Sequence, residues 1–592
     1  MMERSFFRKH IRCTIFWLSL ALLILAASAA QAGTWEYVFF KGTQYPLKVV
    51  FIKGDLPGPT VMVQGGIQGD ERSGFITAQL LSRSTIRKGN LIVLPRANVP
   101  SINLCRRQIN VDMNRRFDRN YNRFYEDRVA RVIRFLLPRC DAFIHLHEGS
   151  GFYYPTYVNN LRNPKRYGQS IIVDTLLWKG AKHSINLETT VKDVLARLNN
   201  GIPHDYQFQL FNTRTFDKAT SYPEMRKSLT CYALAEHNIP ALAVEVSKDI
   251  VQLDWKVGQQ LQATCLLLAQ FGVEAVPPVF TGNDIKRYAA TGVRVTVNGR
   301  PVDNGGVIRL APGATLDVEP EQTGVENFEP SLALFASDRP GVNLIGARRM
   351  ALERFSNLEL RVDGSRLART RVAWTGTMPS SPSDDEPVFV CWLNGNPVFV
   401  RGGGVLHAVL GDQLILEGVY GGKKREVVNF KGFVAIPWNN TGQDLGWEII
   451  LDPENFLGHY ALDAKIPGAQ RFKVVRETPG VRPAHFYVEV APRQVHALRL
   501  ADRHGQSLLI PWSKGGTYSL PEGEYVLQEA WSNGPDSKLV AMVNGTPLNK
   551  GESFRIDADK AASMTVRQAT TFGELGTMTF TASRLAAAQP LN

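Results

Sequence analysis

Cysteine is scarce in this sequence: only 6 of its 592 residues are cysteines. They form no C-x-x-C pair and show no repeated spacing, which argues against a disulfide scaffold and against a cysteine zinc site. A single disulfide stays open, because pairing cannot be read from a sequence. The six are Cys13, Cys105, Cys140, Cys231, Cys265 and Cys391.

Long apolar runs are also missing beyond residue 32. The first residues have a basic start, an apolar run from Thr14 to Ala27 and the small-residue signal Ala30-Gln31-Ala32. This order predicts a secretory signal peptide over residues 1–32, cleaved after Ala32. An uncleaved anchor is the alternative, but the run is shorter than the roughly 20 apolar residues that usually span a bilayer. We expect no transmembrane anchor after cleavage and a periplasmic location.

Acidic residues are outnumbered by basic ones, 55 to 68, which gives a formal net charge of +13. The signal peptide holds four bases and one acid, so about +10 remains after its removal. A basic exported protein suits an anionic cell-wall polymer or a membrane surface, and nucleic acid is not expected as a partner. Charge that serves only solubility is the other interpretation.

The chain is too long for one hydrophobic core, and its pattern divides it. Short apolar runs alternate with helical patterns over residues 33–277, which predicts an α/β domain with a largely parallel sheet. The expected strands are 61–63, 91–94, 142–146 and 242–246, and the expected helices are 75–81, 125–137 and 253–271.

After Pro277-Pro278 helical periodicity nearly disappears, and short alternating runs predict two or three small all-β domains. The polar stretch 378–387 and a break at 478–483 divide this region into 281–378, 388–478 and 484–592. An Asn-Gly pair recurs at 298–299, 394–395 and 544–545, and each pair follows an apolar run. Related hairpins in three domains, or convergent turn chemistry, would both explain it.

Residues with metal-binding chemistry occur in four places along the first domain. The segment Gly65-Gly66-Ile67-Gln68-Gly69-Asp70-Glu71 follows a buried strand, so two candidate ligands three residues apart can face one metal. The segments 111–117 (VDMNRRF), 143–147 (FIHLH) and 244–246 (VEV) follow in that order.

These four segments resemble the funnelin zinc carboxypeptidases, whose patterns include Gly-Gly-x-His-Gly-x-Glu and Val-Asp-x-Asn-Arg-x-Phe. The resemblance covers about residues 33–275 and implies a mostly parallel mixed sheet with flanking helices. Gln68 stands where that family has histidine, a change shared with the murein D,L-carboxypeptidases that set cell shape in curved and helical bacteria.

The resemblance also implies roles for single residues. Gln68, Glu71 and His147 would bind one Zn²⁺, and Glu245 would act as general base. Arg107, or its neighbour Arg106, would stabilise the oxyanion, and Arg115 with Asn114 would bind a terminal carboxylate. Arg106 is also assigned to substrate binding. Asp112 would accept hydrogen bonds from the Gln68 amide nitrogen and turn the amide oxygen toward the metal.

The roles of three further side chains are not decided by the sequence. His145 is expected to point away from His147 as a core or supporting residue, with metal ligation as the alternative. Glu148 is assigned to substrate contact or to a surface loop. Tyr222 lies near the place where the family has a mobile tyrosine, but the local match is too poor to assign it.

The implied function is a periplasmic metallocarboxypeptidase that removes terminal diaminopimelate from murein tripeptide stems. The β-domains would hold the anionic wall polymer or cell-shape partner proteins. A catalytically weak murein-binding module is one alternative, because a glutamine is a weak zinc ligand. Another zinc carboxypeptidase or an amidohydrolase of the same fold is the second.

Overall fold

The computed structural model describes residues 33–583, apart from 182, 292, 323–327, 340, 347, 351, 353, 378–386, 421–425 and 436–439. The expected signal peptide and most of the expected linker at 378–387 therefore lie outside the described residues. Within the described ranges, no helix combines the length and apolar character needed to cross a membrane. The five described cysteines are all free, so they form no disulfide with one another.

The N-terminal domain is built on a mixed sheet with the order β1-β2-β4-β3-β5-β12-β8-β11, and β13 pairs with β4. Its centre, β4-β3-β5-β12, is parallel, whereas β1, β2 and β13 join it antiparallel. The strands are β1 (Gly33–Phe39), β2 (Leu47–Lys53), β3 (Leu56–Gln64), β4 (Thr85–Leu94), β5 (Ala142–Gly149), β8 (Ser170–Val173), β11 (Gln209–Asn212), β12 (Ala241–Ser247) and β13 (Glu274–Val276). The predicted mixed sheet is confirmed.

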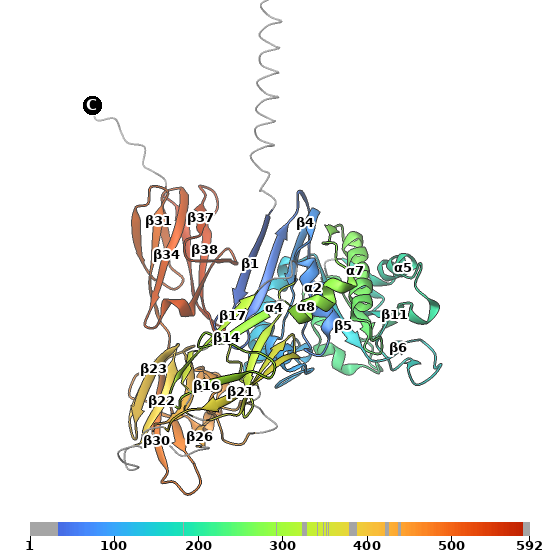
Figure 1. The fold of residues 1–592 in the computed structure, drawn as a ribbon. Coiled ribbons are helices and arrows are strands. Elements are labelled where there is room, and N and C mark those ends of the chain that lie inside the picture. The colour runs from blue at the N-terminus through green and yellow to red at the C-terminus, as the bar shows by residue number, and fades with distance from the viewer. Residues whose placement is uncertain are drawn as a thin grey trace, which may run out of the picture.

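Helices cover both faces of this sheet (Figure 1). One face packs on α2 (Arg72–Leu81), α5 (Leu187–Leu198) and α7 (Leu253–Gln270). The other packs on α4 (Tyr125–Leu136) and α6 (Leu229–His237). The three helices predicted from periodicity, α2, α4 and α7, each bury apolar side chains against the strands, whereas α5 and α6 were not predicted. Short elements complete the domain: α3 (Val99–Leu104), β6 (Phe152–Tyr153), β7 (Arg162–Asn163), β9 (Leu177–Lys179) and β10 (Ser184–Asn186).

A helix that the sequence analysis did not expect follows the first domain. The segment assigned to the start of the first β-domain at residue 281 is α8 (Gly282–Thr291). Ile285 and Tyr288 on α8 belong to the same apolar core as α7, so α8 extends the N-terminal domain. The expectation of β-structure from 281 is therefore wrong for this segment, because Ile285 and Tyr288 pack as one helical face against the core shared with α7.

Each of the three β-domains consists of two packed sheets. The first contains β14 (Val293–Val297), β15 (Arg300–Pro301), β16 (Val307–Leu310), β17 (Thr315–Gln322), β18 (Leu332–Ala336), β19 (Arg348–Met350), β20 (Asn357–Val362) and β21 (Ser365–Trp374). The second contains β22 (Val388–Leu393), β23 (Asn396–Arg401), β24 (Val405–Val409), β25 (Gln413–Val419), β26 (Val428–Phe430), β27 (Glu448–Ile450), β28 (Leu462–Asp463), β29 (Gln470–Arg476) and β30 (Ala484–Ala491). The third contains β31 (Val495–Asp502), β32 (Ser507–Pro511), β33 (Thr517–Leu520), β34 (Gly523–Ser532), β35 (Leu539–Val543), β36 (Thr546–Leu548), β37 (Ser553–Ile556), β38 (Ala562–Gln568) and β39 (Glu574–Ala582).

The boundary between the second and third β-domains differs from the expected break at 478–483. Strand β30 begins at Ala484, pairs antiparallel with β29 and parallel with β24, and so completes the second domain. The second domain therefore ends at Ala491, not at 478. Proline and glycine at 479–483 make only the turn between two neighbouring strands of one sheet, a local signal that looks the same as a linker.

The three β-domains share one connectivity. Their sheets run β15-β14-β17-β19 with β16-β21-β20-β18, then β23-β22-β25-β27 with β24-β30-β29-β26, then β32-β31-β34-β37 with β33-β39-β38-β35-β36. In each domain the third strand pairs parallel with the last one. The chain thus contains the same sandwich three times.

The recurring Asn-Gly pairs form two-residue hairpin turns in all three domains, with positive φ at every Asn and Gly. In the first two domains the turn joins equivalent strands, β14–β15 and β22–β23. In the third it joins β35–β36, a different place in the shared connectivity. The first two turns are therefore a true structural repeat, and the third reflects convergent turn chemistry.

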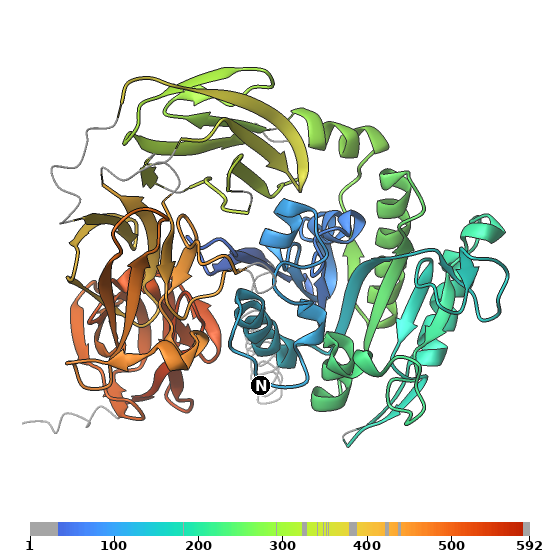
Figure 2. The same cartoon turned by 90° about the horizontal axis from the view of Figure 1, so that it is seen from below.

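The β-domains line the side of the N-terminal domain formed by β1, β2 and β4, whereas α5 and β11 lie on the far side (Figures 1 and 2). The third β-domain packs on the α4 face, where Val540, Met542 and Phe572 join the core of that face. The first β-domain contacts α8 and the segment after β4. The domains therefore form a continuous body around the sheet.

Candidate active site

The four residues expected to carry the chemistry meet at the carboxyl ends of the central strands. Gln68 and Glu71 lie on the loop after β3, His147 is on β5, and Glu245 is on β12 directly beside His147 in the strand register. All four are buried, with exposed fractions of 2%, 2%, 4% and 8%. Sites in open α/β sheets form at this edge, because the loops after parallel strands converge there.

Gln68 is held by a carboxylate. Its Nε2 donates to Asp112 Oδ1 at 3.2 Å and to Oδ2 at 3.3 Å. Because a carboxylate only accepts hydrogen bonds, this contact commits the amide nitrogen and leaves the amide oxygen to face away from Asp112. The hydrogen bond expected from the sequence is present.

Glu71 and His147 are in direct contact, with 2.8 Å between Glu71 Oε2 and His147 Nδ1. Two ligands of one tetrahedral Zn²⁺ stand roughly 3.3 Å apart, given metal–ligand bonds of about 2.0 Å. Among the described residues no cluster of three His, Cys, Asp or Glu side chains has a metal-binding arrangement. A third donor beside Glu71 and His147 would therefore have to be of another residue type, and Gln68 lies three residues before Glu71 on the same loop.

The charges around this group shift several pKa values. Burial raises the pKa of Glu245 to about 7, and His147 partly opposes the rise. Burial would lower the pKa of His147, but the adjacent Glu71 carboxylate raises it overall. Burial would raise the pKa of Asp112, but Arg107 and Arg115 hold it below its usual value. Glu245 is therefore a carboxyl group with a proton affinity suited to proton transfer near neutral pH.

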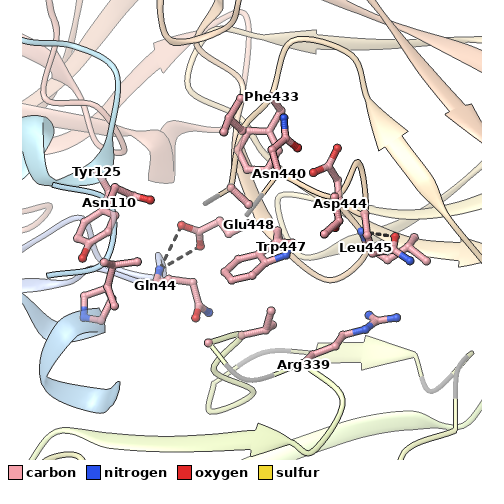
Figure 3. A pocket seen from close by; sticks show the side chains of 18 of the residues that line it. Gln44, Asn110, Tyr125, Arg339, Phe433, Asn440, Asp444, Leu445, Trp447 and Glu448 are labelled. Atoms are coloured by element: carbon pink, nitrogen blue, oxygen red, sulfur yellow. Dashed lines mark hydrogen bonds between the residues drawn. The ribbon is translucent and has the colours of Figure 1, made fainter. Parts of the chain in front are cut away.

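Arg107 and Arg106 point to different places. The Arg107 guanidinium donates to Asp112 Oδ2 at 2.9 Å and lies 3.8 Å from Glu71 Oε1, while its side chain is 48% exposed. Arg106 instead lines a cavity of about 950 Å³ between the N-terminal, first and second β-domains. Figure 3 shows this cavity, where Trp447 and Glu448 of the second β-domain stand opposite Gln44 and Arg339. Of the two arginines, only Arg107 is placed at the Glu71–His147 pair.

Asn114 and Arg115 follow on the short helix Met113–Arg115, capped by Asp112. The Asn114 side-chain oxygen accepts from the backbone N–H of Leu229 at 3.1 Å, and Arg115 Nη1 donates to the Asn114 carbonyl at 2.9 Å. Asn114 is thus partly committed to joining this loop to α6. Arg115 is half-buried beside the site, where its charge lowers the pKa of Asp112.

His145 is not turned away from His147, so that expectation is wrong. The two rings lie 4.0 Å apart, and His145 Nδ1 is 3.1 Å from His147 Nε2. Side chains alternate along a strand with a period of two, so residues 145 and 147 share one face. His145 supports His147 from the side opposite Glu71.

The Glu148 side chain is buried and faces away from the candidate site, but its backbone N–H donates to Glu71 Oε2 at 3.2 Å. The side chain, on β5, accepts from the backbone N–H of Ser73 at 2.6 Å, and pairs with Lys256 of α7 at 2.6 Å. It therefore links α2 to α7 beneath the loop that carries Gln68 and Glu71. Tyr222 donates to the Pro164 carbonyl at 2.9 Å and packs on Tyr167 and Phe211.

Two residues near the site were not singled out in the sequence. Lys248 pairs with Asp70 at 2.5 Å and lies 3.8 Å from Glu71 Oε1. Tyr167 lies close enough to Arg115 and Glu245 for both charges to affect its pKa, which burial raises. The position of Lys248 three residues after Glu245 was the only sequence signal for it. Tyr167 comes from a loop without any recognisable pattern.

Replacing Asp112 tests how the amide is oriented. Asp112→Asn is expected to weaken zinc binding by about 10–100-fold, because asparagine can donate as well as accept and no longer commits the Gln68 nitrogen. Competition with a chelator measures the affinity. Asp118→Asn, an exposed carboxylate of the same loop, should leave it unchanged. Equal affinities for wild type and Asp112→Asn would refute this orienting role.

Comparison with known proteins finds a family whose model matches the N-terminal domain. Residues 34–278 match the model of the catalytic domain of carboxypeptidases controlling helical cell shape. These residues belong to that peptidase family. The match spans the same part of the chain as the expected domain 33–277 and includes every candidate site residue. The N-terminal domain is therefore a carboxypeptidase domain.

Solved structures of similar proteins include the cell shape determinant Csd4 of Helicobacter pylori with a bound tripeptide. That chain is 22% identical, with 75% of this chain and 100% of Csd4 covered and a TM-score of 0.44. The mDAP-bound form of Csd4, a D,L-carboxypeptidase, is 23% identical, covers 73% and 97%, and has a TM-score of 0.43. A succinylglutamate desuccinylase/aspartoacylase of Rhodobacter sphaeroides is 19% identical, covers 42% and 67%, and has a TM-score of 0.27.

A curated relative is the N-alpha-acetyl-L-2,4-diaminobutyric acid deacetylase of Halomonas elongata. It is 32% identical over 99 residues, which cover 16% of this chain and 29% of the deacetylase. The chain thus matches less than a third of the length of this relative.

Proposed function

We propose that this protein is a periplasmic zinc D,L-carboxypeptidase that hydrolyses the γ-D-glutamyl–diaminopimelate bond of murein tripeptide stems. It would trim tripeptides to dipeptides and so affect cell shape. The observation that carries the proposal is the Gln68–Asp112 contact beside the Glu71–His147 pair, within a domain of the cell-shape carboxypeptidase family. A peptidase domain with this donor set, and with Glu245 beside it, is equipped for hydrolysis.

One Zn²⁺, held by Gln68, Glu71 and His147, would supply a Lewis acid that lowers the pKa of water and polarises the scissile carbonyl. Glu245 would take a proton from the attacking water and deliver it to the leaving amine. Arg107, exposed on one side and anchored by Asp112 on the other, would donate to the developing oxyanion. Asp112 thereby orients both Gln68 and Arg107.

Substrate binding is assigned to the loop after Asp112. The Arg115 guanidinium matches a free terminal carboxylate as a two-pronged donor, and the Asn114 amide nitrogen would donate beside it. This pair selects chain ends, as a carboxypeptidase requires. Arg106 faces the cavity between the domains and is not proposed to bind the terminal carboxylate.

The proposal is tested with purified full-length protein and defined muropeptides, with products identified by mass spectrometry. Loss of one diaminopimelate from tripeptides, abolished by chelator and restored by Zn²⁺, is the expected result. Zinc binding without turnover would favour a murein-binding module. Deacylation of small amides with intact tripeptides would favour an amidohydrolase. Either outcome overturns the carboxypeptidase assignment.

The basic chain is also proposed to bind the anionic wall polymer, and the β-domains to meet cell-shape partner proteins. If charge drives polymer binding, cosedimentation of the protein with isolated sacculi should fall several-fold as salt rises from about 50 to 300 mM, because ions screen the attraction. The same assay with bovine serum albumin, an acidic protein, serves as the control. Binding that does not respond to salt would contradict an electrostatic contact.

A further inference from the structure

A buried ion pair joins the first β-domain to the carboxypeptidase domain. Arg96, just after β4, donates through Nε and Nη2 to Asp363 at 2.9 Å each, and the Asp363 side chain is fully buried. The remaining Arg96 donors reach Gln79 of α2 at 2.7 Å and Tyr288 of α8 at 2.8 Å. The pair is two-pronged, and Arg96 makes four hydrogen bonds in all, which makes this a geometrically specific contact.

Asp363 lies in a tight turn that packs against the segment 96–107, which contains Arg96, Arg106 and Arg107. Asp363 and Gly364, with φ of 43° and 76°, form the two-residue hairpin between β20 and β21. A Cβ added to Gly364 would stand 2.4 Å from the Ile102 carbonyl oxygen and 3.1 Å from the Cys105 nitrogen. Ser331 adds a hydrogen bond of 2.6 Å to Asn103. The first β-domain therefore fits closely against α3.

The segment 96–107 in turn supports the loop 65–71, which carries Gln68 and Glu71. The backbone N–H groups of Ala97 and Asn98 donate to Gly65 and Gly66 at 3.1 and 2.8 Å. At the other end of α3, the N–H of Gly69 donates to the Arg106 carbonyl at 3.0 Å. A Cβ on Gly69 would meet Ser101 at 2.0 Å, so the two segments are in backbone contact.

We propose that the first β-domain is a positioning element of the active site. Through Asp363 and Gly364 it holds the segment 96–107 so that Arg107 faces the substrate and the loop bearing Gln68 keeps its place. The carboxypeptidase domain alone lacks this support, since the carboxylate that binds Arg96 belongs to the first β-domain. The kinetic part of this inference rests on the proposed function, whereas the structural part does not.

A matched pair of glycines provides the test. Gly364 and Gly299 both occupy the second position of a two-residue hairpin turn in the first β-domain, with φ of 76° and 73°. Alanine is strained equally at both, but a Cβ at Gly299 meets no atom within 4 Å. Gly364→Ala is expected to lower kcat on tripeptide about tenfold or more with KM changed less than threefold. Gly299→Ala should leave both near the wild-type values.

Hydrogen exchange of the full-length protein gives a readout that does not require activity. Amides in 96–107 should exchange faster in Gly364→Ala than in wild type, and Gly299→Ala should match wild type. If wild type cleaves no tripeptide, the proposed function fails and this comparison still decides the positioning role. Identical exchange and identical kcat for the two alanine variants would overturn it.

A second variant covers the case in which Gly364→Ala does not fold. Asp363→Asn keeps the size of the side chain and removes its charge. As in Gly364→Ala, kcat should fall and amide hydrogen exchange in 96–107 should become faster. Glu319→Gln, an exposed carboxylate on β17 of the same domain, is its control. If Asp363→Asn behaves as Glu319→Gln does, the positioning role is refuted.

Discussion

Glu245→Gln is expected to lower kcat on murein tripeptide by about 10²–10⁴-fold, the usual contribution of a general base. Glutamine keeps the size of the side chain but cannot accept the proton of the attacking water. Burial, which raises the pKa of Glu245 to about 7, makes this carboxylate a far stronger base than an exposed one. Turnover is followed by mass analysis of the released diaminopimelate.

Zinc content, measured by elemental analysis, separates this effect from loss of the metal. The variant should keep its zinc, because Glu245 is not among the three proposed ligands. Glu188→Gln, on the exposed surface of α5, controls for the chemical change and should retain full activity. A Glu245→Gln enzyme with near wild-type kcat would exclude Glu245 as the base.

Arg107→Gln is expected to lower kcat by about 10²–10³-fold, as loss of one oxyanion donor does in other hydrolases. Arg106→Gln, next to it in the chain, should change kcat less than threefold. We expect this difference because the two side chains point in different directions. Arg107 lies 3.8 Å from Glu71, whereas Arg106 lines the cavity between domains. Steady-state kinetics on one muropeptide measures both variants.

The neighbouring arginines control for each other, since both substitutions remove one positive charge from the same segment. Because Arg107 also contacts Asp112, zinc affinity of Arg107→Gln is measured beside kcat. A loss of kcat explained entirely by weaker zinc binding would show that Arg107 acts only through Asp112. A larger effect from Arg106→Gln would reverse the assignment.

The predicted secondary structure of the first domain was largely correct because its signals are local. The segments 61–63, 91–94, 142–146 and 242–246 all fall within strands, and the three predicted helices overlap α2, α4 and α7. A continuous apolar run bounded by glycine and polar residues predicts a strand that is buried on both faces of a sheet. The three Asn-Gly turns were likewise predictable, since positive φ at two positions demands those residues.

Errors arose where the decision depends on partners distant in sequence. The segment 282–291 folds as a helix because α7 offers a surface to Ile285 and Tyr288. Residues 484–491 belong to the second β-domain because they pair with β24 on one side and with β29 on the other. His145 was misplaced for a different reason, because the two-residue period of its strand puts it on the face of His147.

The residue types of the candidate site and their order along the chain can be read from the amino-acid sequence alone. The family resemblance suggests the Gln68–Asp112 pairing, and because a carboxylate can only accept, the chemistry of the two groups predicts that the amide nitrogen faces Asp112. Which arginine faces Glu71 depends on the folded structure, since the side chains of two adjacent loop residues have no fixed directions. The folded structure also decides that Asp363 of a β-domain supports the arginine segment, because that contact joins residues 267 positions apart and depends on how two domains pack.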